Sequence, residues 1–84
     1  MTELDTKAVA FSAGALWGGA MLLLGWLAAF AGAGTALVQA FGSIYIGFAP
    51  TAVGGVIGGV YGFIDMAIGG YLFASIYNWA EGRF

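Results

Sequence analysis

The sequence contains no cysteine and no histidine, and it has very few charged residues. Its 84 residues include two basic and four acidic side chains, for a net charge of −2. The missing cysteine excludes disulfides, thiolate chemistry and sulfur-ligated metals. The missing histidine and the scarcity of carboxylates leave one chain unable to assemble a metal site or a nucleophilic triad. We therefore expect no enzymatic activity, no metal and no cofactor. Two basic residues are also too few to hold a nucleic acid.

Most of the sequence is apolar. Hydrophobic residues make up 62% of the chain and charged residues 7%, whereas a soluble domain has roughly 25% charged residues. A soluble chain of this length cannot bury so much apolar surface, because small domains leave much of their surface exposed. We therefore expect a single membrane domain surrounded by the lipid bilayer.

Two segments are long enough to cross that bilayer as helices. Residues 8–30 carry no formal charge, and residues 51–80 are interrupted only by Asp65; crossing a hydrocarbon core of roughly 30 Å takes about 20 residues. A short polar N-terminus (1–7), an apolar connector (31–50) and a C-terminal stub (81–84) complete the chain. The predicted fold is all-α: a hairpin of two transmembrane helices.

The connector is too apolar for a free aqueous loop. We expect a short helix near residues 34–42 that lies at the membrane interface or packs against protein. The connector has no Lys or Arg, while Lys7 and Arg83 flank the two predicted spans. The positive-inside rule then places both termini in the cytoplasm.

A competing interpretation of the first apolar segment is a cleaved signal peptide. Ala29-Phe30-Ala31 resembles a small-x-small cleavage site. Two features argue against cleavage: acidic residues precede the segment, and its apolar run exceeds the usual 7–15 residues. Trp26, Tyr77 and Trp79 lie near the predicted span ends, where aromatic side chains anchor helices at the membrane–water interface.

Glycines form a stripe along each predicted helix. At 100° per residue, the glycines of each stripe project onto one face, and small residues on such a face let helix backbones approach closely. The stripe of the second segment is wider than one partner helix can cover, which favours self-association over pairing within a monomer alone. The predicted packing residues are Gly14, Gly18, Gly25 and Gly32 in the first segment, and Gly54, Gly58, Gly62 and Gly69 in the second.

Asp65 is the only charged residue between Lys7 and Glu81. An acid inside a membrane segment is a functional-site hypothesis by default. The helical wheel places Asp65 on the glycine face, pointing at protein, with Tyr61 one turn earlier as a hydrogen-bond partner. Three roles remain open: a structural hydrogen bond between helices, which we favour, a proton or cation site lining a pore, and a contact to a partner protein.

Several stretches of the chain resemble small prokaryotic membrane proteins labelled bacteriophage holin or holin-like. The resemblance is carried by Trp17-Gly18, Gly42-Ser43-Ile44-Tyr45-Ile46-Gly47-Phe48, Gly58-Gly59-Val60-Tyr61-Gly62-Phe63-Ile64-Asp65-Met66-Ala67-Ile68-Gly69-Gly70 and Ser75-Ile76-Tyr77-Asn78. It implies a self-associating protein of the prokaryotic cytoplasmic membrane that opens lesions during lysis. We therefore expect a holin-like homo-oligomeric pore or channel with Asp65 inward.

Two alternatives to a holin-like pore come from other classes. The chain resembles subunit c of rotary ATP synthases in size and in its mid-membrane carboxylate, but it lacks that family's polar connecting loop. The second alternative is a structural accessory subunit that docks into a larger membrane protein complex through the same glycines.

Overall fold

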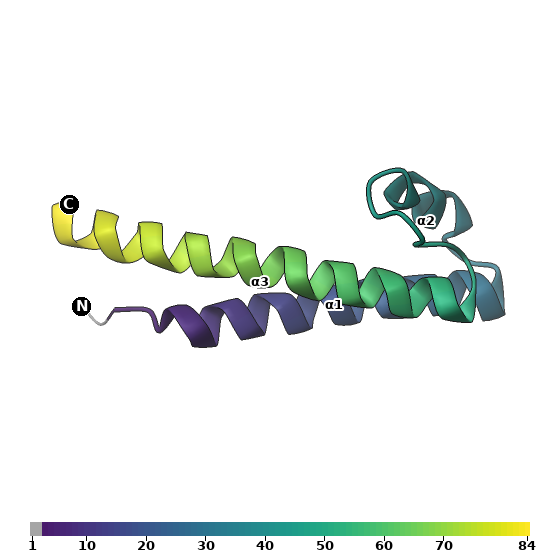
Figure 1. Cartoon of the computed structure of the whole chain (residues 1–84), viewed down its shortest axis with the longest axis horizontal. Coiled ribbons are helices and arrows are strands. Elements are labelled where there is room, and N and C mark those ends of the chain that lie inside the picture. Colours follow the sequence, from purple (N-terminus) through teal and green to yellow (C-terminus); the bar gives the residue numbers. More distant parts are fainter. Residues whose placement is uncertain (1–2) are drawn as a thin grey trace.

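The computed structural model describes residues 3–84 as three helices: α1 (Thr6–Ala31), α2 (Thr35–Gly42) and α3 (Ala52–Arg83). These residues contain no strand, which confirms the all-α class. α1 and α3 are both long and apolar enough to cross a membrane. They run antiparallel and side by side, so that the two ends of the chain lie at the same end of the molecule (Figure 1).

Side-chain caps and a left-handed glycine set the helix boundaries. The Asp5 carboxylate accepts hydrogen bonds from the Lys7 and Ala8 N–H groups, so α1 begins before the predicted span. Gly32 ends α1 with a φ of 68°, a conformation that glycine adopts without steric cost. Thr51 caps α3 by accepting a hydrogen bond from the Gly54 N–H at 2.8 Å. These caps satisfy backbone groups that a helix end leaves free.

The predicted C-terminal stub is wrong for residues 81–83. α3 continues through Arg83, and the Phe84 N–H donates to the Ala80 carbonyl at 2.9 Å. Neither proline nor a left-handed glycine interrupts the helix there, since Gly82 has a helical backbone. The second helix is therefore 32 residues long.

Glycine brings the backbones of α1 and α3 into near contact along a surface that we call the seam. A Cβ atom added at Gly14 would lie 2.7 Å from the Phe63 carbonyl oxygen, and one added at Gly18 would lie 2.7 Å from that of Gly59. At Gly25 it would lie 2.6 Å from the Gly55 Cα. Real Cβ atoms do not approach backbone this closely, so the seam requires glycine at these positions.

The connector folds back along the hairpin instead of extending beyond its end (Figure 1). Val38 of α2 and Phe48 of the following loop are 0% and 4% exposed, and they form a small core with Met21 and Ala28 of α1. Of the two predicted locations for the connector, packing against protein is the one that the structure shows. Burial of these apolar side chains stabilises the arrangement.

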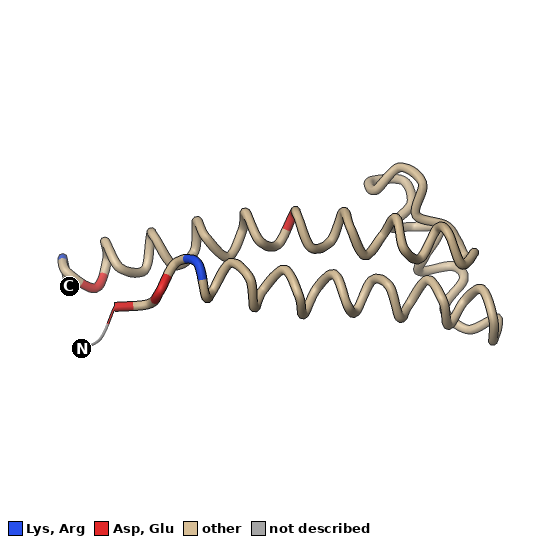
Figure 2. Tube along the Cα trace, turned by 60° about the horizontal axis from the view of Figure 1, so that its bottom comes forward, with Lys and Arg blue, Asp and Glu red and all other residues tan. Residues whose placement is uncertain are grey.

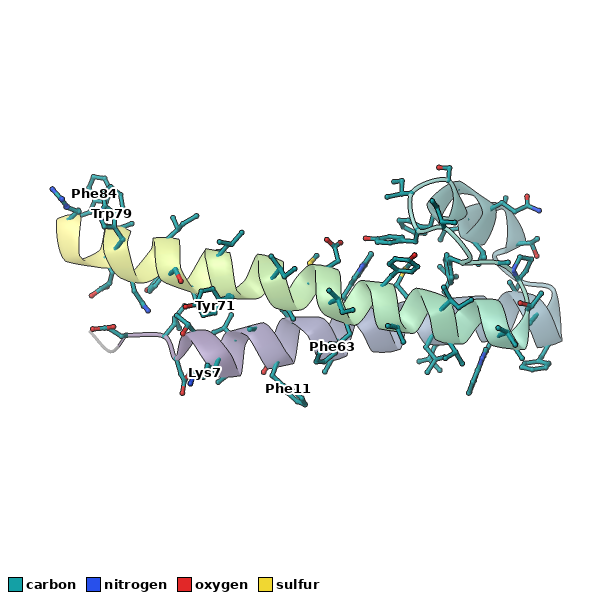
Figure 3. All side chains as sticks on the ribbon, viewed as in Figure 1. Lys7, Phe11, Phe63, Tyr71, Trp79 and Phe84 are labelled. Atoms are coloured by element: carbon teal, nitrogen blue, oxygen red, sulfur yellow. The ribbon has the colours of Figure 1, made fainter. Side chains whose placement is uncertain are left out.

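The rest of the described surface is mostly apolar, and its charged residues concentrate at one end. Charged residues gather at the end that carries both termini, and Asp65 stands alone part of the way along α3 (Figure 2). Lys7, Trp79 and Phe84 lie at this charged end, whereas Phe11 projects from the flank of the hairpin and its ring meets that of Phe63 (Figure 3). Large apolar side chains remain exposed along both helices, including Leu16, Leu23 and Phe30.

Candidate functional site around Asp65

Asp65 does not lie in the seam between α1 and α3. Its side chain is exposed, on the side of α3 that faces the connector. Gly62 and Gly70 are the neighbouring α3 glycines that meet α1, and they stand about 60° and 140° around the helix from Asp65. The prediction that Asp65 shares the helix-packing face is therefore wrong. The helical wheel assigned the whole glycine-rich sector of α3 to one partner helix. In the structure, α1 covers one part of this sector and the connector covers the other.

The connector supplies the hydrogen-bond partner of Asp65. The Tyr45 hydroxyl donates to Asp65 Oδ2 at 2.7 Å. Accepting this bond, the Asp65 carboxylate raises the pKa of the Tyr45 phenol, and burial of the phenol acts in the same direction. The phenol therefore stays protonated and remains a donor. Tyr61, the predicted partner, makes no hydrogen bond to Asp65.

Aromatic side chains surround this hydrogen bond. The Tyr61 ring centroid lies 6.0 Å from that of Tyr45, so Tyr61 is a packing neighbour within the site. Trp17 of α1 meets Phe41 of α2 edge to face, with ring centroids 6.0 Å apart. The Trp17 Nε1 atom is buried without a hydrogen-bond partner among residues 3–84.

This cluster offers limited chemistry. Asp65 is its only carboxylate, and residues 3–84 contain no group of three or more acidic side chains that could hold a metal ion. An ionised carboxylate has about four acceptor sites, of which Tyr45 occupies one. Asp65 can therefore accept further donors, take up a proton or contact a cation.

The eight predicted packing glycines fall into three groups. Gly14, Gly18, Gly25 and Gly62 lie in the seam. Gly54 and Gly58 instead pack against the connector, at Ala49 and at the Phe48 ring.

Gly32 and Gly69 pack against neither partner, which corrects the prediction for both. Gly32 is the left-handed cap of α1 and has open space around it. Gly69 has only Met66 of its own helix nearby, because α1 meets the adjacent Gly70. A Cβ at Gly70 would lie 2.9 Å from the Ala13 Cβ atom.

The predicted aromatic anchors lie at the two ends of the hairpin. Trp26, near the connector end, also ties the helices together, because its Nε1–H donates to the Ala52 carbonyl at 2.9 Å. Tyr77 stacks on Phe73 near the other end of α3, with ring centroids 6.3 Å apart. The Arg83 guanidinium lies 5.2 Å from the Trp79 ring centroid, within cation–π range.

Two features of the structure had no clear signal in the sequence. Asn78 clamps the start of the chain to the end of α3: its amide accepts from the Leu4 N–H and donates to the Leu4 carbonyl, both at 2.9 Å. An apolar groove of about 420 Å³ lies beside the seam and is lined by α1 and α3. Its lining includes Gly18, Gly19, Leu22, Trp26, Gly59 and Phe63.

Comparison of the chain with protein-family models, with curated proteins and with solved structures gives no match. Function therefore has to be argued from the geometry of the chain itself.

Proposed function

We propose that this protein crosses the prokaryotic cytoplasmic membrane twice and self-associates into a holin-like, pore- or channel-type homo-oligomer with Asp65 turned inward. In this arrangement α1 and α3 are the membrane spans, and both termini lie in the cytoplasm. The shared end of the two termini carries Lys7 and Arg83 (Figure 2), which agrees with the positive-inside rule.

The dimensions of α1 match those of a bilayer. Lys7 and Trp26, a basic residue and an interfacial aromatic near opposite ends of α1, are 19 residues apart. At 1.5 Å per residue this separation is about 28 Å, close to the thickness of a hydrocarbon core. The exposed side chains between them include Phe11, Leu16 and Leu23, which suit lipid contact.

The observation that carries the proposal is the exposure of Asp65. Asp65 lies about 20 Å along α3 from its start at Ala52, well inside the membrane span. An aspartate at the centre of a transmembrane helix costs about 2.5–3.5 kcal/mol. The hydrogen bond from Tyr45 offsets part of this cost and leaves other acceptor sites open. Because lipid cannot fill those sites, we infer that Asp65 faces a water-filled interior or another polypeptide.

In a glycine-mediated oligomer, the glycines would join helices of separate copies. Here the glycines of the seam join α1 to α3 within one chain. Gly14, Gly18 and Gly25 already pack against α3 of the same chain. Contacts between copies would therefore use the face that carries Asp65 and the connector. A ring of inward carboxylates would favour cations, as acidic rings do in cation channels.

A second candidate function is a structural accessory subunit of a larger membrane complex. The apolar groove beside the seam favours it, because Gly19 in its lining has no atom within 4 Å of an added Cβ and so leaves room for side chains of a foreign helix. Extraction in mild detergent discriminates between the two: the pore proposal requires a symmetric homo-oligomer, and the accessory subunit requires a hetero-complex.

Ion flux in liposomes tests the pore directly. The purified protein should conduct cations, and Asp65→Asn should reduce the flux or change its dependence on pH. Ser12→Ala is the matched control, because Ser12 is an exposed polar residue of α1 outside the Asp65 cluster. The pore is refuted if the wild-type protein conducts nothing. An Asp65→Asn variant that conducts like wild type at every pH refutes the role of the carboxylate.

A further inference from the structure

The connector folds back along part of the hairpin before it returns to the start of α3 (Figure 1). Phe41, at the end of α2, contacts Trp17 near the middle of α1. Tyr45, a few residues later, bonds to Asp65. The chain then runs back past Gly58, which Phe48 covers, to Thr51. Gly47 lies against Ile57, so residues 42–48, which we call the tip, pack beside α3 near Ile57 and Gly58, about 8–9 Å from its start, and the Tyr45 side chain extends from there to Asp65.

The connector end of the hairpin cannot stand outside the bilayer in water. Gln39 and Thr51 are exposed there, but the large exposed side chains are apolar: Phe30 is 74% exposed, Val53 70% and Leu27 51%. Exposing such side chains to water costs roughly 1.5–3 kcal/mol each for full exposure. The charged residues all gather at the opposite end, apart from Asp65 (Figure 2). The bilayer and its interface must therefore cover the connector end, and the tip lies inside the bilayer, between the level of Trp26 and that of Asp65.

The tip also leaves backbone groups without partners at this depth. Among residues 3–84, nothing accepts a hydrogen bond from the N–H groups of Ile46 and Gly47. Both residues are exposed, and Gly47 has a left-handed backbone with a φ of 97°. An unsatisfied backbone group facing lipid costs several kcal/mol, so irregular backbone at membrane depth occurs only inside protein or beside water.

We propose that residues 32–50 form a re-entrant segment, which enters the bilayer from the side opposite the termini and lines the water-filled interior with its tip. The placement beside the interior rests on the proposed pore. Tyr45 holds the tip on α3, and water in the interior satisfies the Ile46 and Gly47 N–H groups. The exposed side chains of Ile44 and Ile46 then narrow the interior on the connector side of Asp65.

Because the chain contains no cysteine, single spin labels can test this placement in liposomes. A label at Ile46→Cys should be as accessible to a water-soluble nickel complex as a label at Glu3→Cys, an exposed position at the charged end. A label at Leu16→Cys is the lipid-facing reference, because Leu16 is 78% exposed on the opposite face of α1. It should be several-fold less accessible to nickel. Ser43→Cys, also an exposed tip residue, repeats the test independently.

A pair of labels tests the depth of the tip. Labels at Ile46→Cys and Ile57→Cys should show strong dipolar broadening, because Ile57 lies against Gly47 of the tip. Weak broadening, or nickel access at Ile46 and Ser43 as low as at Leu16, overturns the re-entrant segment. Strong broadening with high nickel access but no ion flux supports the re-entrant segment and refutes the pore. Ion flux with weak broadening supports the pore and refutes the re-entrant segment.

Discussion

The seam between α1 and α3 makes opposite predictions for two adjacent glycines. Replacing Gly18 by alanine places a methyl group 2.7 Å from the Gly59 carbonyl oxygen and 3.0 Å from Phe63. Replacing Gly19 by alanine places the same methyl group in open space, with no atom within 4 Å. The two variants have the same composition and lie at neighbouring positions of one helix, so they differ only in what the new methyl group meets.

The magnitude of this difference follows from two effects. Alanine in place of glycine stabilises a helix interior by about 0.8–1.0 kcal/mol, and both variants receive this gain. Overpacking costs typically about 1–3 kcal/mol where neighbours must move, and the neighbours of Gly18 are largely backbone. The free energy of unfolding of Gly18→Ala should therefore lie about 1–3 kcal/mol below that of Gly19→Ala, because the helix-propensity gain cancels between them.

Helix separation in mixed micelles measures this difference. Fluorophores on Ala8→Cys and Ala80→Cys report the separation of the two helices at their shared end, and titration with sodium dodecyl sulfate gives the free energy of unfolding. The adjacent pair Gly70→Ala and Gly69→Ala should repeat the pattern, because only Gly70 meets α1. Equal stabilities for Gly18→Ala and Gly19→Ala would refute the seam as described.

Three further substitutions test hydrogen bonds that tie distant segments together. Tyr45→Phe should destabilise the protein by about 0.5–3 kcal/mol and free the tip, and the measurement is faster amide exchange at Tyr45 and Phe48. Tyr61→Phe removes no bond to Asp65, so it should change neither the stability nor the exchange at these two amides. Trp26→Phe should cost about 0.5–1.5 kcal/mol in the same micelle titration, because it removes the bond to Ala52; an unchanged midpoint would contradict this. Asn78→Ala should release Leu4 from α3, raising exchange at the Leu4 amide on the order of tenfold while α1 stays protected; unchanged exchange would refute the clamp.

The two long helices could be predicted from the sequence because their signals are local. Length and apolarity identify residues 8–30 and 51–80, and the structure places α1 and α3 over these ranges. Gly14, Gly18 and Gly25 indicated close helix packing, because residues spaced four and seven positions apart lie on one face of a helix. The short helix expected near residues 34–42 coincides with α2.

The position of Asp65 could not be predicted because it depends on a distant contact. Periodicity shows which residues of α3 share a sector, but it does not show which element covers each part of that sector. The connector folds back and covers Gly54 and Gly58, leaving Gly62 and Gly70 to α1. Tyr45 gave no signal of its own, since its hydroxyl matters only once the connector has turned toward α3.

The three faces of α3 together explain why one carboxylate can persist in so apolar a helix. One face, with Gly62 and Gly70, is closed by α1 and has no space for a side chain. A second, with Val56, Val60 and Ile64, is exposed and apolar and suits lipid. Only the face under the connector offers Asp65 a hydrogen-bond donor, through Tyr45. An acid moved onto either of the other faces would meet backbone or hydrocarbon, so the position of Asp65 depends on the fold-back of the connector.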